Sequence, residues 1–262
     1  MKIGWIGLGQ MGLPTAKIIA EAGHEVRGYD VQPPEDGKAD GVKIVDTVAE
    51  AAKDCDLLCI AVFSDKQVED VLTGPDGVMA DLKPGAVVAV FTTGSIEAIQ
   101  EMAARAPDGV SVLDTCFSRK QSEAQSGALT LLIGGDADAI ERVRPALASF
   151  SPRIYHVGAS GAGRSIKLVN NILFAAHAQV AADALKLAEG LGLERSSTVT
   201  ALMDCSGTSD VMGNFVESEP GPVLEQFYRY MIKDVNAATQ AAQKVNVDLG
   251  PLLSATAAYR EG

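Results

Sequence analysis

The sequence predicts an α/β protein in which a doubly wound parallel sheet is followed by a long helix and an all-helical C-terminal domain. Two observations lead to this fold class. Over residues 1–165, short apolar runs alternate with amphipathic segments, which is typical of strand–helix–strand repeats around a parallel sheet. From Arg164 to Leu191 the composition changes: this stretch is rich in Ala and Leu, has no Pro, and has Gly only near its end.

The apolar runs of the first part predict strands that are buried on both faces. They are nearly continuous in Val, Ile, Leu, Ala and Cys, and they do not alternate with polar residues. The predicted strands are Lys2–Leu8, Glu25–Tyr29, Leu57–Phe63, Ala86–Thr92, Ser111–Phe117 and Leu129–Ile133. The predicted helices between them include Leu13–Ala22, Asp65–Leu72, Ile96–Ala106 and Ala137–Phe150. Residues 154–157 also favour a strand.

The long Ala- and Leu-rich stretch sets the predicted domain boundary. We expect residues 1–164 to form one domain and residues 165–262 a second, helical domain that starts with an interdomain helix at 165–191. As a helix, the stretch from Arg164 would extend about 40 Å at 1.5 Å per residue. Breaks at Ser206–Asp210 and Glu217–Pro222 separate further helices. The Ala-rich face of Phe174–Ala184 predicts close helix packing, which we expect at a subunit interface.

Composition excludes several classes of protein. Lys and Arg number 22 against 34 Asp and Glu, so the net charge is −12, and this argues against nucleic acid as a partner. No apolar run reaches the roughly 18 residues that a membrane span requires. The four Cys and three His have no metal-ligand spacing, so we expect neither a metal site nor a disulfide framework. The N-terminus lacks a signal-peptide pattern, which favours the cytoplasm.

A glycine-rich turn follows the first predicted strand directly. It contains Gly7, Leu8, Gly9, Gln10, Met11 and Gly12, and a predicted helix starts behind it. In this context the glycines allow a tight turn and a close approach of the backbone to a pyrophosphate, while the helix N-terminus faces the phosphates. The pattern predicts a Rossmann-type, NAD(P)-binding domain. The alternative is that these glycines only form a tight turn.

Asp30, at the end of the second predicted strand, bears on the choice of cofactor. Its carboxylate would accept a hydrogen bond from a ribose hydroxyl, and no Arg follows it to neutralise a 2′-phosphate. The residue therefore favours NAD, with NADP as the alternative. The alternative interpretation is that Asp30 only caps the end of a strand.

A second motif stands at the predicted domain boundary. Lys167 and Asn171 are four residues apart and would share one face of the long helix, with Asn170 beside them. Such polar groups in an apolar helix are costly unless they find partners or face a cavity. The other interpretation is a solvated lysine with asparagines that cap a neighbouring segment.

With these motifs in order, the chain resembles the β-hydroxyacid dehydrogenase family, typified by 3-hydroxyisobutyrate dehydrogenase and tartronate semialdehyde reductase. Residues 6–12 with Gly23-His24-Glu25-Val26 look like its N-terminal signature. Gly161-Ala162-Gly163 through Lys167 and Asn171 is similar to its catalytic motif. Lys233-Asp234 resembles its late lysine–aspartate pair, and residues 206–209 its C-terminal loop.

The resemblance implies roles for individual residues. Lys167 would be the catalytic residue, Asn171 would orient the substrate, and Lys233 would close over the cofactor and substrate. Thr93 stands where the family places a threonine near the nicotinamide ribose, and Phe63-Ser64 corresponds to a loop that lines the cofactor. The resemblance also implies a homodimer or homotetramer.

The chain departs from the family at its substrate-binding stretch. Ser118 matches the family's substrate-binding serine, but Arg119 and Lys120 replace two glycines. The two basic residues would supply positive charge for a more anionic substrate or would simply face solvent. We include Ser118, Arg119, Lys120 and Asn170 among the candidate substrate-binding residues. Cys116 is a candidate nucleophile, but packing in a strand is the more ordinary role for it.

Together these features predict an oxidoreductase that transfers a hydride between a nicotinamide cofactor and a small β-hydroxyacid or its semialdehyde. Lys167 would act as general acid and base on this anionic substrate. The alternatives are an imine reductase-like enzyme, whose group usually lacks the lysine, and a non-catalytic NAD-binding sensor. A 6-phosphogluconate dehydrogenase is disfavoured because its helical domain is much longer.

Overall fold

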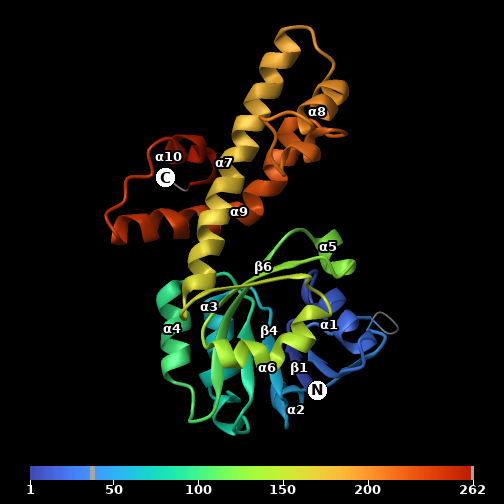
Figure 1. The fold of residues 1–262 in the computed structure, drawn as a ribbon, viewed down its shortest axis with the longest axis vertical. Helices are drawn as coiled ribbons and strands as arrows, with labels where there is room; N and C mark the ends of the chain where they lie inside the picture. Colours follow the sequence, from blue (N-terminus) through green and yellow to red (C-terminus); the bar gives the residue numbers. More distant parts are fainter. Residues whose placement is uncertain (36–38, 261–262) are drawn as a thin grey trace. The chain divides into compact units, whose positions relative to one another are not determined.

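The computed structural model describes residues 1–35 and 39–260. The chain divides into two compact units, Met1–Lys167 and Leu168–Gly262. A sheet with its flanking helices makes up the first unit, and helices make up the second (Figure 1). The predicted fold class, a doubly wound sheet with a long helix and a helical C-terminal region, is confirmed.

In the described part of the first unit, the strands form one eight-stranded sheet in the order β3-β2-β1-β4-β5-β6-β7-β8. The strands are β1 (Lys2–Ile6), β2 (Glu25–Tyr29), β3 (Val42–Ile44), β4 (Leu57–Ile60), β5 (Val87–Val90), β6 (Ser111–Ser118), β7 (Thr130–Gly134) and β8 (Arg153–Gly158). Strands β1 to β6 are parallel to one another. Because the chain runs outward from β1 through β3 and then returns to β4 on the other side of β1, the sheet has a topological switch point between β1 and β4.

The last two strands differ from the prediction of a wholly parallel sheet. β7 pairs with β6 in the antiparallel direction, with Ser118 opposite Thr130, and β8 is parallel to β7. The connection from β6 to β7 holds only a short helix, α5 (Gln121–Gln125). A parallel return needs a crossover that carries the chain to the opposite end of the sheet, and this connection stays at one end.

Helices cover both faces of the sheet (Figure 1). They are α1 (Gly12–Glu21), α2 (Val48–Ala52), α3 (Asp65–Thr73), α4 (Ile96–Ala104) and α6 (Ala137–Ala148), with the 3-10 turn η1 (Met79–Asp81). Residues of α1 and α6 share one buried cluster with the sheet, while residues of α2, α3 and α4 share the other. The strands are therefore apolar on both faces, as their unbroken sequence runs predict.

Aromatic packing fills the cluster on the α1 and α6 face. The fully buried ring of Trp5 stacks on Phe91 at 5.4 Å between centroids and meets Phe150 edge-on at 6.4 Å. Phe117 also stacks on Phe91, at 4.4 Å between centroids. These rings come from β1, from β6, from the residue after β5 and from the segment after α6. Their packing holds the carboxyl ends of the strands together.

The second unit consists of helices packed on the long helix α7 (Ala162–Gly190), whose first residues belong to the first unit. The other elements are α8 (Arg195–Met203), η2 (Met212–Phe215), α9 (Pro220–Lys244), α10 (Pro251–Ala255) and η3 (Ala257–Tyr259). Helix α9 starts inside the predicted break at 217–222, because Pro220 is tolerated in a first helical turn.

The alanine face of α7 packs within its own unit, which corrects the expectation of a subunit interface there. Ala178 and Ala182 are fully buried in a cluster with Met212 and Phe215 of η2. Small side chains allow this close approach of the two segments. In the described residues, no helix is both long enough and apolar enough to cross a membrane.

Candidate functional site

In the glycine-rich turn, the backbone after β1 lies close to the backbone after β4. Gly7 has a φ of 95°, and a Cβ atom there would lie 2.3 Å from the Ala61 carbonyl oxygen. A Cβ at Gly12 would lie 1.9 Å from the Gly7 carbonyl oxygen. Both positions therefore need glycine for steric reasons. The turn crosses the switch point of the sheet, where open α/β sheets bind ligands.

Trp5, the single tryptophan of the chain, supports this turn from within the buried core. Its buried indole Nε1 donates a 3.0 Å hydrogen bond to the Gly7 carbonyl oxygen. The aromatic core thus helps to hold the turn in its positive-φ conformation.

The N-terminus of α1 lacks a side-chain cap, unlike those of α3, α4 and α6. The position before the helix is Met11, which makes no side-chain capping bond, whereas Ser64, Ser95 and Asp136 cap α3, α4 and α6. Helix N-termini carry N–H groups without intrahelical partners and attract anions. Together with the open space around Gly9, where a Cβ would meet nothing within 4 Å, this end of α1 fits the pyrophosphate of a dinucleotide.

A cavity of about 680 Å³ opens beside the turn. Its lining comes from three segments. They are the turn with Leu8, Gly9 and Gln10, the helix α1, and α5 with Gln121 and Gln125. The short helix after β6 therefore faces the predicted cofactor turn.

Asp30 lies directly behind β2, as predicted, and bonds to the turn itself. Its Oδ2 accepts from the Leu8 backbone N–H at 2.6 Å, and its Oδ1 accepts from the Gln32 N–H at 2.9 Å. The carboxylate is half-buried and fixed beside Gly7 to Gly12. Asp30 is therefore more than the cap of a strand, because it helps to shape the turn.

The loops after β4 and β5 carry three predicted cofactor residues, Phe63, Ser64 and Thr93, and the structure places these loops side by side. The Thr92 hydroxyl donates to the Val62 carbonyl oxygen at 2.8 Å. The Phe63 N–H donates to Gln67 Oε1 at 2.9 Å, within a capping box formed by Ser64 and Gln67. Phe63 is 77% exposed, so its ring is presented to the surroundings.

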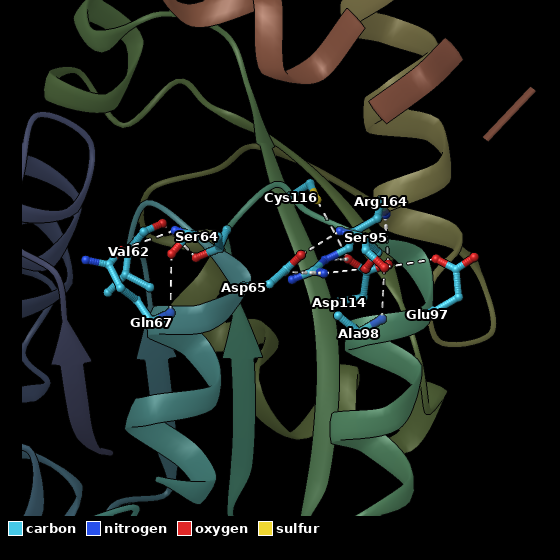
Figure 2. A network of polar contacts seen from close by, with 11 residues as sticks. Val62, Ser64, Asp65, Gln67, Ser95, Glu97, Ala98, Asp114, Cys116 and Arg164 are labelled. Carbon is cyan, nitrogen blue, oxygen red and sulfur yellow. Dashed lines mark hydrogen bonds and ion pairs between the residues drawn. The ribbon is translucent and has the colours of Figure 1, made fainter. Parts of the chain in front are cut away.

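A network of charged groups lies where these loops meet the start of α7 (Figure 2). The Arg164 guanidinium donates to Asp65 Oδ1 at 2.7 Å and to the Ser95 carbonyl oxygen. The Arg164 backbone N–H donates to Asp114 Oδ2 at 2.8 Å. Burial raises the pKa of the Asp114 carboxyl, and the N–H and charge of Arg164 act in the opposite direction.

Cys116 belongs to the same network but does not have the properties of a nucleophile. It is fully buried in β6, its Sγ contacts Asp114 Oδ1 at 3.7 Å, and burial together with the Asp114 charge raises the pKa of the thiol well above its usual value. The Lys167 charge acts on the pKa of this thiol in the opposite direction. A protonated, inaccessible thiol favours the packing role.

The substrate-binding candidates Ser118, Arg119 and Lys120 lie at the end of β6 and before α5. Ser118 is half-buried, and both basic residues are exposed. Arg119 has a φ of 97°, which is a conformation that favours glycine. The backbone thus keeps the form of the glycines that the family resemblance leads one to expect here, although the side chain is an arginine.

The candidates of α7 are divided between the two units. Lys167 is half-buried and belongs to the first unit, whereas Asn170 and Asn171 belong to the second. Asn171 is buried, and its Nδ2 donates to Asp234 Oδ2 at 2.6 Å while its Oδ1 accepts from Asn170 at 2.9 Å. Lys233, the neighbour of Asp234 on α9, is exposed.

Four residues make these contacts, each within its own unit, although the sequence alone did not single them out as site residues. They are Asp65, Asp114, Arg164 and Asp234. Arg164 stands one turn before Lys167, and Asp65 follows Ser64 directly, so each had a positional signal. That signal is weak, because their importance depends on partners up to 99 residues away in the chain.

In the described residues, no group of three or more His, Cys, Asp or Glu side chains is arranged to hold a metal ion. His156 lies on β8, where a strand was predicted, and its Nε2 contacts the carbonyl oxygens of Gly135 and Gly158. These contacts give His156 a structural role in the turn after β7.

Comparison with known proteins gives matches along nearly the whole chain. Residues 2–158 match the family model described as the NAD binding domain of 6-phosphogluconate dehydrogenase. Residues 161–262 match the one described as NAD-binding of NADP-dependent 3-hydroxyisobutyrate dehydrogenase.

Individual relatives agree with these models. The chain is 32% identical to 3-sulfolactaldehyde reductase of Escherichia coli strain K12, over 94% of this chain and 85% of the relative. It is 30% identical to 2-(hydroxymethyl)glutarate dehydrogenase of Eubacterium barkeri, over 100% of this chain and 89% of the relative. The solved structure of Mycobacterium tuberculosis 3-hydroxyisobutyrate dehydrogenase with L-serine has a TM-score of 0.82 at 27% identity and covers 98% of this chain and 91% of its own.

Proposed function

Because this chain belongs to the β-hydroxyacid dehydrogenase family, we propose that it interconverts a small anionic β-hydroxyacid and its semialdehyde, with Lys167 as the general acid and base. Its cofactor is NAD or NADP, as the family models indicate. The observation that carries the proposal is the direct bonding of Arg164, in the first turn of α7 and one turn before Lys167, to the segments after β4 and β5.

The chemistry divides between cofactor and chain. When bound, the nicotinamide supplies or accepts the hydride. Oxidation of the hydroxyl-bearing carbon also releases a proton, and Lys167 would take that proton in oxidation and return it in reduction. The residues that would hold the cofactor are the turn from Gly7 to Gly12, Asp30, and the loops with Phe63, Ser64 and Thr93. The family resemblance adds Lys233 to them.

Asn171 would orient the substrate, and its surroundings support a fixed amide. The amide nitrogen is used by Asp234 and the amide oxygen by Asn170, so the group has one preferred orientation. Asn170 and Ser118 are the further candidates for contact with the substrate. We include Asp234 as the residue that holds Asn171.

Two alternatives remain distinct from this proposal. An imine reductase-like enzyme would use the same cofactor turn, but the presence of Lys167 weighs against it, because that group usually lacks the lysine. A non-catalytic NAD-binding sensor would bind the dinucleotide without turnover, and the altered stretch Ser118–Lys120 is its main support. The retention of both Lys167 and Asn171 favours an enzyme.

We infer that NAD is preferred over NADP. A 2′-phosphate beside Asp30 would face a carboxylate already fixed by Leu8 and Gln32, and the residue after it is the apolar Val31. Like-charge proximity without a compensating arginine disfavours the phosphorylated cofactor.

We also infer that Arg119 selects a substrate with a second anionic group. An arginine held at a φ of 97° costs of the order of 1–3 kcal/mol in backbone strain. Lys120 adds a second positive charge two residues after Ser118. A gain in binding an anion would offset this strain, because hydrogen bonds between charged groups are among the strong ones.

The proposed homodimer or homotetramer has a candidate surface on α7. Leu173, Val180 and Leu187 follow one another at seven-residue intervals, and their exposed fractions are 44%, 57% and 66%. Such spacing forms one apolar stripe along a helix, and exposed apolar stripes of this kind mark association surfaces. This stripe lies apart from the alanine face, which packs inside the unit.

We expect Lys167→Met to lower kcat by at least about 10²-fold, because proton transfer would lose its carrier. The measurement is NADH absorbance during a screen of hydroxyacids and semialdehydes, with NADH binding followed separately by its fluorescence. Lys186→Met, on the exposed surface of the same helix, is the control and should behave like the wild type. Near-normal turnover in Lys167→Met would remove the lysine from the mechanism, and NADH binding without turnover of any compound by the wild type would favour the sensor.

Asp30→Ala should weaken NAD binding and reduce the difference in kcat/KM between NAD and NADP. The ribose hydroxyls of NAD would lose an acceptor, and the 2′-phosphate of NADP would no longer face a negative charge. Asp30→Asn is the matched variant, because its amide oxygen can still accept from Leu8 N–H. The ratio of kcat/KM for the two cofactors measures the effect. An unchanged ratio in both variants would refute the assignment of NAD.

Arg119→Gly should raise the thermal midpoint, because glycine tolerates the local φ, and should raise KM for dianionic hydroxyacids by about tenfold relative to monoanionic ones. Lys120→Ala tests the neighbouring charge in the same assay. If Arg119→Gly became more stable but kept the wild-type ratio of KM values, Arg119 would not contribute to substrate selection.

Val180→Glu with Leu187→Glu should shift the protein toward monomers, because charges would be forced into an apolar contact. Sedimentation velocity measures the distribution of species. Lys186→Gln, which changes an exposed charge beside the stripe, should leave it unchanged. A wild-type distribution in the glutamate variant would exclude this face as the interface.

A further inference from the structure

Arg164 is a buried cation that the proposed chemistry does not use. Its side chain is 1% exposed, which is rare for arginine. Buried guanidinium groups require partners that satisfy both charge and hydrogen bonds. The identity of those partners is informative, because each belongs to a different element of the first unit (Figure 2).

The guanidinium joins the two cofactor-lining loops. It bonds to Asp65, the residue after Ser64, and to the carbonyl oxygen of Ser95, two residues after Thr93. Asp65 Oδ2 also accepts from the Ser95 N–H at 2.8 Å. Both loops are thereby held in one arrangement by a single side chain and its counter-ion.

The fit around this contact is tight. A Cβ atom at Gly94 would lie 2.1 Å from Asp65 Oδ1, so the loop after β5 approaches the carboxylate as closely as glycine permits. Because there is little free space, a displacement of the Asp65 carboxylate would move the loop that carries Thr93.

The backbone of Arg164 is fixed to the sheet as well. Its N–H donates to Asp114 Oδ2 at 2.8 Å, and a Cβ at Gly163 would lie 2.6 Å from the Asp114 carbonyl oxygen. The Nε of Arg164 is 3.9 Å from Asp114 Oδ1 and has no hydrogen-bond partner among the described residues. Lys167 follows one helical turn later, so the anchored turn determines where the backbone of Lys167 lies.

We propose that Arg164 is a positioning residue that sets the first turn of α7, and with it Lys167, against the two loops that line the cofactor site. This inference rests on the proposed function. It assigns Arg164 no contact with substrate or cofactor, and Arg164 acts through Asp65, Ser95 and Asp114. A purely structural ion pair would stabilise the fold without affecting the affinity for cofactor or the turnover of the folded enzyme.

The test compares Arg164→Met, Asp65→Asn and the double variant in the full chain. The measurements are the Kd of NADH from its fluorescence, kcat and KM for the best hydroxyacid, and the thermal midpoint. Arg105→Met is the matched control, because Arg105 pairs with Glu69 across α4 and α3 at 3.8 Å with both side chains about half exposed. It should change Kd and kcat by less than twofold.

We expect each single variant to raise the Kd of NADH and to lower kcat by about tenfold or more, since small displacements of reacting groups cost one to two orders of magnitude. The double variant should be no worse than the more impaired single variant, because the two residues act as a unit. Wild-type Kd and kcat in variants with a lowered thermal midpoint would overturn the proposal.

Two further variants keep the inference testable if Arg164→Met does not fold. Arg164→Lys retains the charge but loses the planar guanidinium, whose Nη1 donates to both Asp65 and Ser95, and it should recover only part of the affinity. Gly94→Ala adds a methyl group that would clash with the Asp65 carboxylate, while Arg164 itself is unchanged. This variant should raise the Kd of NADH in the same way. Unchanged Kd in both would also overturn the proposal. If the wild type turns over no hydroxyacid, the proposed function fails, while the NADH Kd still decides whether Arg164 sets the cofactor loops.

Discussion

The close approach of two strand ends at Gly7 is the constraint on which the rest of the first unit depends. The carbonyl oxygen of Ala61 occupies the space that a side chain at Gly7 would need, and the indole of Trp5 fixes the Gly7 carbonyl from within the core. A tight turn at this point directs the uncapped N-terminus of α1 toward the crevice between β1 and β4. The anion-binding end of a helix and the switch point of the sheet are thereby brought to the same place.

A second constraint is the burial of charge beside that crevice. Asp114 is fully buried, and its desolvation is tolerated because Arg164 supplies both an N–H donor and a nearby cation. The same arginine uses its Nη1 to donate to Asp65 and to the Ser95 carbonyl oxygen. One buried cation thus links β6, the loops after β4 and β5, and the first turn of α7. Loops held in this way lose little further entropy when a ligand binds.

The stretch after β6, which we propose binds the substrate, has a backbone conformation typical of glycine but carries basic side chains. Arg119 keeps a glycine-like φ, so the local chain path has been retained while positive charge has been added. Strain of this kind persists only where the surrounding structure determines the conformation, and here β6 before it and α5 after it do so. The result is a loop with two basic side chains directly after Ser118.

The sequence by itself determined the fold class, the cofactor turn and the long helix, because apolar runs, glycine spacing and the absence of Pro act over short distances in the chain. It also indicated Lys167, Asn171 and Asp30 through motifs in fixed order. It missed β3, α2 and α5, which have three to five residues and show no clear periodicity, and it did not predict the reversed direction of β7. Only the tertiary structure decided that Arg164 joins Asp65 and Asp114, and that Asp234 holds Asn171, because such pairs depend on contacts between segments 50 to 99 residues apart.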